Sequence, residues 1–484
     1  MRSDLSIRCP QTRHRLYRLE KAFLVLISCF VPHLAMSSET EQINPNIVII
    51  LVDDLGWNDV GYHNENVSTP NIDRLAKAGV ELNRFYVNPT CSPTRASLMS
   101  GEFATTHGVD SPVQWHSRTG LPLKHRILPQ FLKSEGYSTH LVGKWHLGSA
   151  DRDYWPQRRG FDSFYGHLNG GIGYHDHIFS GGKDWQKDGV TIREKGYSTD
   201  LITRESINII KSSSRTNPFF LTVSYNAPHT PIETRQTGEK AQKNRSTYLE
   251  MISTLDSGIG QILSALEDEG LLHETIIFFT SDNGGFSPAP WFVELLIPPM
   301  RDGLADNNPL LGGKGWPNEG GVRVPAAVWW AGKIESEQPN DQTMHVADLL
   351  PTLAELIGFD VGEIDGKSVL QPLIDGNLIE RGPIIVANMG SEALIDWPWK
   401  LIRRASLPVL PDFMKSDSWF LFNLQQDPQE QIDLSDIEEE RFNSMRDQLL
   451  SYPRHKEIEL DTDHPWDTFG GEETREPWAE AAIN

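Results

Sequence analysis

The chain of 484 residues has only three cysteines and few basic residues for its length. Three cysteines cannot build a disulfide framework, so the fold must depend on a hydrophobic core. Lysine and arginine number 44 against 66 aspartates and glutamates, a formal net charge of −22. An acidic chain of this kind lacks the basic face that nucleic acid binding requires. Hydrophobic residues make up 38% of the sequence, which excludes a disordered chain.

Residues 1–37 are typical of a secretory signal peptide. Basic residues precede an apolar run over residues 22–31, and small residues follow it at positions 35 and 37. The run is too short to cross a membrane, and we predict no transmembrane segment after removal of the leader. We therefore expect an exported protein, periplasmic or secreted. An unusual N-terminal helix and lipid anchoring at Cys29 are the alternatives.

Four apolar runs predict strands that are buried on both faces of a parallel sheet. They cover residues 46–52, 137–142, 219–225 and 275–280. Helical periodicity lies between them, for example in residues 69–78, 127–135 and 248–269. This alternation predicts an α/β fold.

Each predicted strand leads into residues that can do chemistry. In chain order these are Asp53 and Asp54, Lys144 and His146, His229, and Asp282 and Asn283. Ligands of α/β proteins bind beyond the carboxyl ends of the strands, so these side chains are predicted to share one site. Taken alone, a lysine at such a position is most often a solvated surface residue, and an isolated histidine at a strand end is more often structural.

The mature chain would keep one cysteine, Cys91. Pro93 suits the first turn of a helix and Gly101 suits its C-terminal cap, which places Cys91 at a helix N-terminus. Free amides and the helix dipole favour an anion there, and Arg95 lies one turn further along. A reactive thiolate is one interpretation, and a buried, inert cysteine is the other.

Cys91-Ser92-Pro93-Thr94-Arg95, continued as Ala96-Ser97-Leu98-Met99-Ser100-Gly101, resembles the signature of type I sulfatases. The resemblance implies that Cys91 is oxidised to formylglycine, whose hydrated aldehyde is the nucleophile. It implies a maturation partner, either a formylglycine-generating enzyme or an anaerobic sulfatase-maturating enzyme. Residues 54–61 and 158–162 resemble the arylsulfatase B-like branch.

The family resemblance also implies a fold. We expect an alkaline-phosphatase-like sandwich with a large mixed, mostly parallel sheet flanked by helices. Residues 43–360 are predicted to form the catalytic α/β domain, and residues 361–484 a smaller C-terminal subdomain with a short antiparallel sheet and a tail. Short strand-like runs there cover residues 383–387, 399–403 and 419–423, before an acidic helix near residues 437–450.

A metal site follows from the same resemblance. Its expected ligands are Asp53, Asp54, Asp282 and Asn283, together with the residue made from Cys91. Oxygen ligands of this kind suit a hard divalent cation, so Ca²⁺ is expected and Mg²⁺ is the alternative.

The remaining roles complete the catalytic set that the resemblance implies. Lys144 and Lys314 would hold the sulfate, and Arg95 would offset the charge of the nucleophile. His146 would bind the formylglycine hydroxyl, and His229 would protonate the departing oxygen.

The implied function is hydrolysis of sulfate esters in a sulfated polysaccharide or oligosaccharide, with galactan or galactosaminoglycan 4-sulfates as the expected substrates. A basic and aromatic stretch within residues 152–177 either lines the substrate cleft or forms a structural loop. Leu311 and Trp316 depart from the family pattern near the substrate rim, which puts the sugar preference in doubt. The alternatives are a phosphoester hydrolase on the same fold and a non-catalytic relic that binds sulfated glycans.

Overall fold

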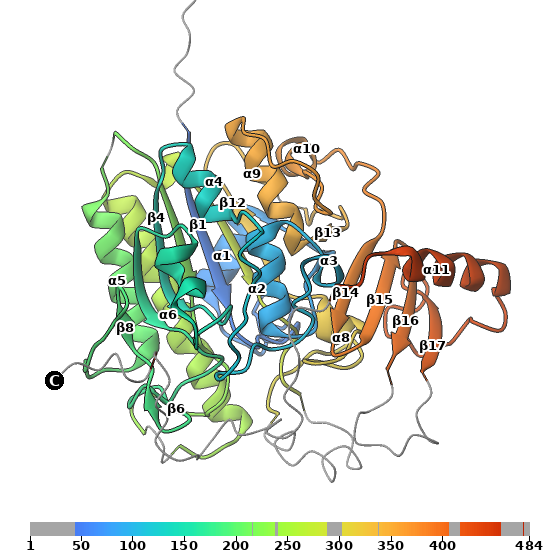
Figure 1. Cartoon of the computed structure of the whole chain (residues 1–484), viewed down its shortest axis with the longest axis horizontal. Coiled ribbons are helices and arrows are strands. Elements are labelled where there is room, and N and C mark those ends of the chain that lie inside the picture. The colour runs from blue at the N-terminus through green and yellow to red at the C-terminus, as the bar shows by residue number, and fades with distance from the viewer. Residues whose placement is uncertain are drawn as a thin grey trace, which may run out of the picture. The chain divides into compact units, whose positions relative to one another are not determined.

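A nine-stranded mixed sheet forms the centre of the described part of the chain, in the computed structural model shown in Figure 1. The strand order is β2-β12-β11-β1-β10-β4-β5-β8-β9. The five central strands are parallel: β11 (Thr275–Ser281), β1 (Asn46–Val52), β10 (Phe219–Ser224), β4 (Ser138–Lys144) and β5 (Ser163–His167). The edges are antiparallel: β2 (Val80–Glu81), β12 (Ala326–Trp329), β8 (Gln186–Lys187) and β9 (Val190–Thr191).

The structure describes residues 44–214, 216–237, 241–287, 303–336, 338–405, 417–455 and 478. The chain divides into two compact units, Met1–Ile43 and Asn44–Asn484, and the first lies outside the described residues. The signal peptide and the lipid anchor at Cys29 therefore stay predictions. None of the helices in these ranges is long and apolar enough to span a membrane.

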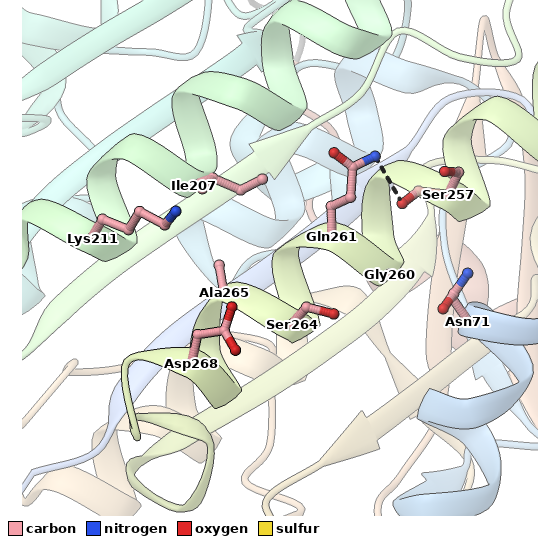
Figure 2. Close-up of a pocket in the computed structure, with 9 residues that line it drawn as sticks. All are labelled: Asn71, Ile207, Lys211, Ser257, Gly260, Gln261, Ser264, Ala265 and Asp268. Atoms are coloured by element: carbon pink, nitrogen blue, oxygen red, sulfur yellow. Dashed lines mark hydrogen bonds between the residues drawn. The ribbon is translucent and has the colours of Figure 1, made fainter.

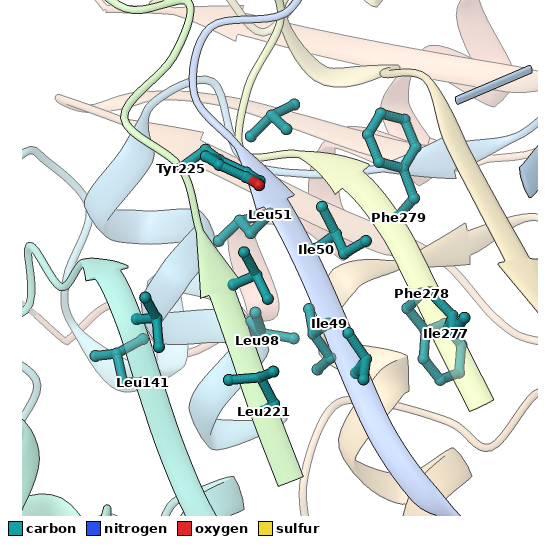
Figure 3. Packing of buried hydrophobic residues seen from close by; sticks show 14 of the residues in the cluster. Ile49, Ile50, Leu51, Leu98, Leu141, Leu221, Tyr225, Ile277, Phe278 and Phe279 are labelled. Carbon is teal, nitrogen blue, oxygen red and sulfur yellow. The ribbon is translucent and has the colours of Figure 1, made fainter. Parts of the chain in front are cut away.

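The predicted buried strands are present because their apolar runs are covered on both faces. All seven residues of β1 are buried between β10 and β11. Figure 3 shows Leu98 packed close to Ile49 and Leu221 in this core. β4 runs two residues further than predicted, so Lys144 is the last residue of a strand rather than part of a loop.

Two groups of helices pack with the sheet. In one group, α6 (Arg245–Asp268) contacts both α1 (Pro70–Ala78) and α5 (Ser198–Ser212). In the other, α2 (Cys91–Ser100) contacts α4 (Leu128–Ser134) and α9 (Leu349–Ile357). Shorter elements are α3 (Ala104–His107), α8 (Glu319–Val322), α10 (Leu370–Asp375), and the pairs β3 (Phe85–Tyr86) with β13 (Met344–His345) and β6 (Ile178–Phe179) with β7 (Gly182–Lys183).

The C-terminal part forms an antiparallel meander, as expected. Its strands are β14 (Ile384–Asn388), β15 (Ser391–Asp396), β16 (Trp399–Arg404) and β17 (Ser418–Asn423), and α11 (Glu439–Ser451) packs on β15 and β16. β15 was not predicted, because polar residues at both ends leave only a short apolar segment at residues 393–395. The large mixed sheet and the small antiparallel sheet are thus confirmed, whereas the boundary at residue 360 stays a prediction.

His107 contacts Ser97 of α2 and makes the free energy of unfolding depend on pH. Its Nε2 lies 3.1 Å from the hydroxyl of Ser97, and Nδ1 accepts the backbone N–H of Val109. Burial lowers the pKa of His107 from 6.5 to about 3. Between these values the unfolded chain binds a proton here and the folded chain does not, so stability falls as the pH falls below 6.5.

His107→Asn keeps an acceptor for Val109 but removes this proton. We expect the stability advantage of the wild type over the variant to shrink by about 1.4 kcal/mol per pH unit below about pH 6. Urea unfolding of both proteins at pH 7.5, 6.5 and 5.5 measures this difference. A difference that stays constant across that range would contradict the assignment.

Candidate active site

The carboxyl ends of four neighbouring strands, β11, β1, β10 and β4, face the N-terminus of α2. The order of these strands in the sheet explains the meeting of distant residues. Val52 of β1 is in register with Ser281 of β11, so the two pairs of polar residues that follow lie side by side: Asp53 with Asp54, and Asp282 with Asn283. The amide of Asn283 donates to Asp54 Oδ1 at 2.7 Å, and the backbone N–H of Asp54 donates to Asp282 Oδ1 at 3.4 Å.

Cys91 is the first residue of α2, and every residue of this helix is buried. Gly101 ends the helix with φ of 73°, as its position predicts. Cys91 is only 3% exposed. Burial raises the pKa of its thiol, although the charges of Lys144 and Lys314 act in the opposite direction. The environment thus favours a thiol at neutral pH and disfavours the thiolate interpretation.

Two side-chain oxygens of the site lack a hydrogen-bond partner within the described part of the chain. Asp53 Oδ1 and Asn283 Oδ1 are buried and have no hydrogen-bond partner among the described residues. Asp53, Cys91 and Asp282 each offer a ligand atom within 4.8 Å of the others, and so do Asp53, Asp54 and His229. Burial, and next the charge of Asp282, raises the pKa of Asp53 to about 7. These crowded oxygens fit a hard divalent cation.

Three cations balance the three carboxylates. Lys144 Nζ lies 2.6 Å from Asp53 Oδ2, and both side chains are fully buried. Arg95 donates twice to Asp282 Oδ2, at 2.7 and 3.0 Å. Lys314 Nζ lies 2.7 Å from Asp54 Oδ1.

The charge balance decides what the site attracts. Burial alone would raise the pKa of Asp54, but the charge of Lys314 and then that of His229 outweigh it and lower this pKa to about 2. The ion pairs therefore leave the cluster close to neutral, and a divalent cation would make it positive. An anion would then be attracted to this position in spite of the acidic chain.

The two histidines present one nitrogen each to the site. Nε2 of His146 lies 3.1 Å from the carbonyl oxygen of Val113, so Nε2 carries the proton and Nδ1 is an acceptor. This Nδ1 is buried and has no partner among the residues described. His229 donates from Nδ1 to the carbonyl of Thr230 at 2.5 Å, and its Nε2 lies 3.7 Å from Asp54 Oδ2. Burial, together with the charge of Lys314, lowers the pKa of His229 to about 3.

A buried loop that the sequence did not indicate lies against both histidines. A Cβ atom added at Gly170 would lie 2.7 Å from His146 Cε1, and one at Gly171 would lie 3.3 Å from His229 Cε1. Asp184 holds this loop by accepting the backbone N–H groups of Leu168 and Asn169 and the amide of Asn169. Burial raises the pKa of Asp184 to about 6. The glycine pair Gly170-Gly171 after β5 was the only feature of the sequence that could have indicated this loop.

All ten candidate residues are therefore brought together, either directly or through one shared neighbour. The basic and aromatic stretch of residues 152–177, in contrast, is mostly structural. His167, Tyr174 and His177 are fully buried. The guanidinium of Arg159 donates to the backbone carbonyl of Leu121 at 2.6 Å. Most of this stretch is thus unavailable to a substrate, and the structural alternative is the better description.

A surface pocket elsewhere lies beside α1, α5 and α6 (Figure 2). Ile207 and Lys211 of α5 face Gln261 and Asp268 of α6 across it, and Asn71 lies at one end. Gln261 is engaged by a bond to the carbonyl of its own helix at Ser257. The residues that line the pocket include none of the candidate site residues.

Comparisons with known proteins identify the family. The sulfatase family profile matches residues 45–359. N-acetylgalactosamine-6-sulfatase of Homo sapiens is 32% identical over 388 residues, which is 73% of this chain and 72% of that protein. Arylsulfatase J of Mus musculus is 34% identical over 352 residues, which is 69% of this chain and 56% of that protein. The crystal structure of Ps i-CgsB in complex with k-i-k-neocarrahexaose matches with a TM-score of 0.75 and 30% identity, over 88% of this chain and 96% of that chain.

These likenesses confirm the predicted alkaline-phosphatase-like fold class. They do not single out the arylsulfatase B-like branch, which stays a prediction. The chain belongs to the sulfatase family and is a hydrolase of sulfuric esters.

Proposed function

We propose that the protein is an exported sulfatase that removes ester sulfate from a sulfated polysaccharide or oligosaccharide, with a formylglycine nucleophile made from Cys91 by a maturation enzyme. The observation that carries this proposal is the position of Cys91. It begins a buried helix, next to the carboxylates of Asp53 and Asp282, and the oxygen Oδ1 of Asp53 lacks a partner among the described residues. Three cations lie beside these carboxylates. A maturation step also accounts for a cysteine whose environment disfavours the thiolate.

Ca²⁺ held by Asp53, Asp54, Asp282, Asn283 and residue 91 would act as a Lewis acid on the sulfate. Mg²⁺ is the alternative cation. The hydrated aldehyde would supply the second hydroxyl that an ordinary serine or cysteine lacks.

The chain's own residues would do the rest. Lys144 and Lys314 bind sulfate oxygens and offset their charge. Arg95 holds Asp282 in place through two hydrogen bonds. Nδ1 of His146 accepts the hydrogen bond of a hydroxyl at residue 91, because Val113 fixes the proton on the other nitrogen. Nε2 of His229 faces the site without a proton in the neutral ring, because Nδ1 donates to Thr230. The negative charge of a bound sulfate would favour uptake of a proton at Nε2, and this proton would then pass to the departing alcohol.

Two lines support a carbohydrate substrate. The relatives include an N-acetylgalactosamine-6-sulfatase, and the similar structure of Ps i-CgsB holds k-i-k-neocarrahexaose. Within this class we propose galactan or galactosaminoglycan 4-sulfates, because residues 54–61 and 158–162 resemble the arylsulfatase B-like branch. The likeness to the 6-sulfatase supports the same sugar and the other sulfate position, so the two positions must be compared directly.

Sulfate release from matched pairs of oligosaccharides tests this proposal. Galactosaminoglycan and galactan oligosaccharides that carry sulfate only at position 4 or only at position 6 are incubated with the wild type, and Cys91→Ala is the inactive control. We expect the 4-sulfates to be hydrolysed about tenfold faster or more. Preference for the 6-sulfates would overturn the position. Faster release of phosphate from the corresponding phosphate esters would favour the phosphoester hydrolase, and release from neither class would favour the relic.

A further inference from the structure

We infer that the C-terminal sheet positions the catalytic residues, and that Asn388 is the positioning residue. Asn388 ends β14 and is 5% exposed. Its Oδ1 accepts the hydroxyl of Thr90 at 2.8 Å, and its Nδ2 donates to the carbonyl of Gly315 at 3.1 Å. One planar amide therefore joins the residue before Cys91 to the residue after Lys314. The inference rests on the proposed function, in which those two residues act on the same sulfate.

The hydroxyl of Thr90 supports the positioning role of Asn388, because it binds Asn388 and does not cap its own helix. Thr90 is the N-cap of α2, and a threonine there usually accepts a backbone N–H of the first turn, which contributes about 1 kcal/mol. In the described structure Thr90 makes no such capping bond and donates to Asn388 instead. Loss of the capping bond brings α2 no local stability, so the contact between Thr90 and Asn388 indicates a function outside the helix.

Further hydrogen bonds join the same three segments, which are the end of β14, the start of α2 and the loop of Lys314. The backbone N–H of Ala387 donates to Asn88 Oδ1 at 3.1 Å, and the Asn88 amide donates to Ser97 in α2 at 3.0 Å. The backbone N–H of Gly315 donates to the carbonyl of Pro89 at 2.7 Å. The end of β14, the start of α2 and the loop of Lys314 are thus bonded to one another.

The Lys314 loop needs a support of this kind. Gly315 has φ of 89°, a conformation that other residues rarely adopt, and a Cβ atom there would touch nothing. The loop is therefore open beside Gly315, where its hydrogen bonds to Pro89 and Asn388 hold it. Lys314 has to keep its ammonium group within a fraction of an ångström of a productive position, since a misplacement of about 1 Å can cost about 100-fold in rate.

The far end of the loop is held by the same sheet. Glu430 Oε2 accepts the amide of Asn318 at 3.0 Å and the backbone N–H of Glu319 at 2.8 Å. Lys400 of β16 lies 2.8 Å from Glu319 and 3.0 Å from Glu430, and the three side chains are fully buried in the ion pairs. Buried ion pairs add little net stability, so a role in fixing the arrangement is the better explanation.

The test compares Asn388→Ala with Thr90→Val, which keeps the shape of Thr90 and removes its hydroxyl. We expect each variant to lower kcat by about 10- to 100-fold when the rate is divided by the concentration of enzyme that carries formylglycine. KM should change by less than about threefold. The double variant should be no worse than Asn388→Ala, because Asn388→Ala already removes the contact that Thr90→Val removes. Asn423→Ala is the matched control, since Asn423 is also a buried residue at the end of a strand in the same sheet but accepts the backbone N–H groups of Gln425 and Gln426 in its own turn.

Hydrogen exchange gives a readout that needs no substrate. Asn388→Ala should speed exchange in peptides that cover residues 89–92 and 313–316, whereas Asn423→Ala should leave both at the wild-type rate. If Asn388→Ala does not fold, Thr90→Val alone carries both measurements. Wild-type exchange in these peptides, or an additive double variant, would overturn the inference. A wild type that carries formylglycine and releases no sulfate would instead overturn the proposed function.

Discussion

Cys91→Ser is expected to fold normally, to release the alcohol no more than once per molecule and to keep the sulfo group on the serine. Serine fits the buried first position of α2, and its hydroxyl lies beside the same cations as the wild-type side chain. Serine is not a thiol, and within the proposed chemistry it lacks the second hydroxyl that expels the sulfate. Because removal of a nucleophile typically costs many orders of magnitude, we expect the steady-state rate to fall by at least about 10⁴-fold.

Two measurements check this result. Rapid mixing with substrate should give an initial burst of alcohol that is no larger than the enzyme concentration, and the mass of the peptide that carries residue 91 should then increase by one sulfo group. Cys91→Ala should give neither the burst nor the mass increase. Sustained turnover by Cys91→Ser at a rate near that of the wild type would refute the formylglycine mechanism. The peptide mass of the wild type provides an independent check of conversion.

Removal of divalent cations is the second change with a large expected effect. Without a cation, Asp53, Asp54 and Asp282 crowd one another in a buried site with unpartnered oxygens. We expect a chelator to abolish activity and to lower the unfolding temperature. Ca²⁺ added at 100 times its dissociation constant should restore about 2.7 kcal/mol of stability.

Asp282→Asn separates the cation effect from general damage. The variant leaves Arg95 without its anionic partner, so its stability changes for more than one reason. The comparison is therefore made within each protein, with and without Ca²⁺, and the gain on adding Ca²⁺ should be lost in Asp282→Asn. Asp256→Asn is the control, because Asp256 is a buried carboxylate of α6 that binds Asn71 outside the site, and its gain should match the wild type. An undiminished gain in Asp282→Asn would remove Asp282 from the ligand set.

Strand ends were the part of the site that could be predicted. β1 and β11 each appear in the sequence as an apolar run followed by a carboxylate, and this local pattern needs no knowledge of the neighbouring strand. The order β11-β1-β10-β4 has no local signal, yet that order brings Asp53 beside Asp282. Lys314 follows no predicted strand, so its placement depended on the family resemblance alone.

The features that the sequence left open or did not indicate have a common physical cause. His167 and His177 are polar residues in a loop-like sequence and suggest a surface, but long-range packing buries them. Asp184 and Asn388 contribute through contacts with residues far away in the chain, and nothing in their immediate sequence marks them. At Cys91 two effects compete, because a helix N-terminus lowers the pKa of a thiol and burial raises it. Burial outweighs the opposing effects, and the pKa of this thiol is raised.

The hydrogen bond between Thr90 and Asn388 can form only late in synthesis of the chain. It joins residues that are 298 positions apart, so Cys91 leaves the ribosome long before its brace exists. At about 5–20 residues per second, the interval is about 15–60 s. During that time the cysteine segment cannot be closed off by the strand that later holds it. Burial of Cys91 in the finished protein and chemical access to it in the growing chain are therefore separated in time by the order of the sequence itself.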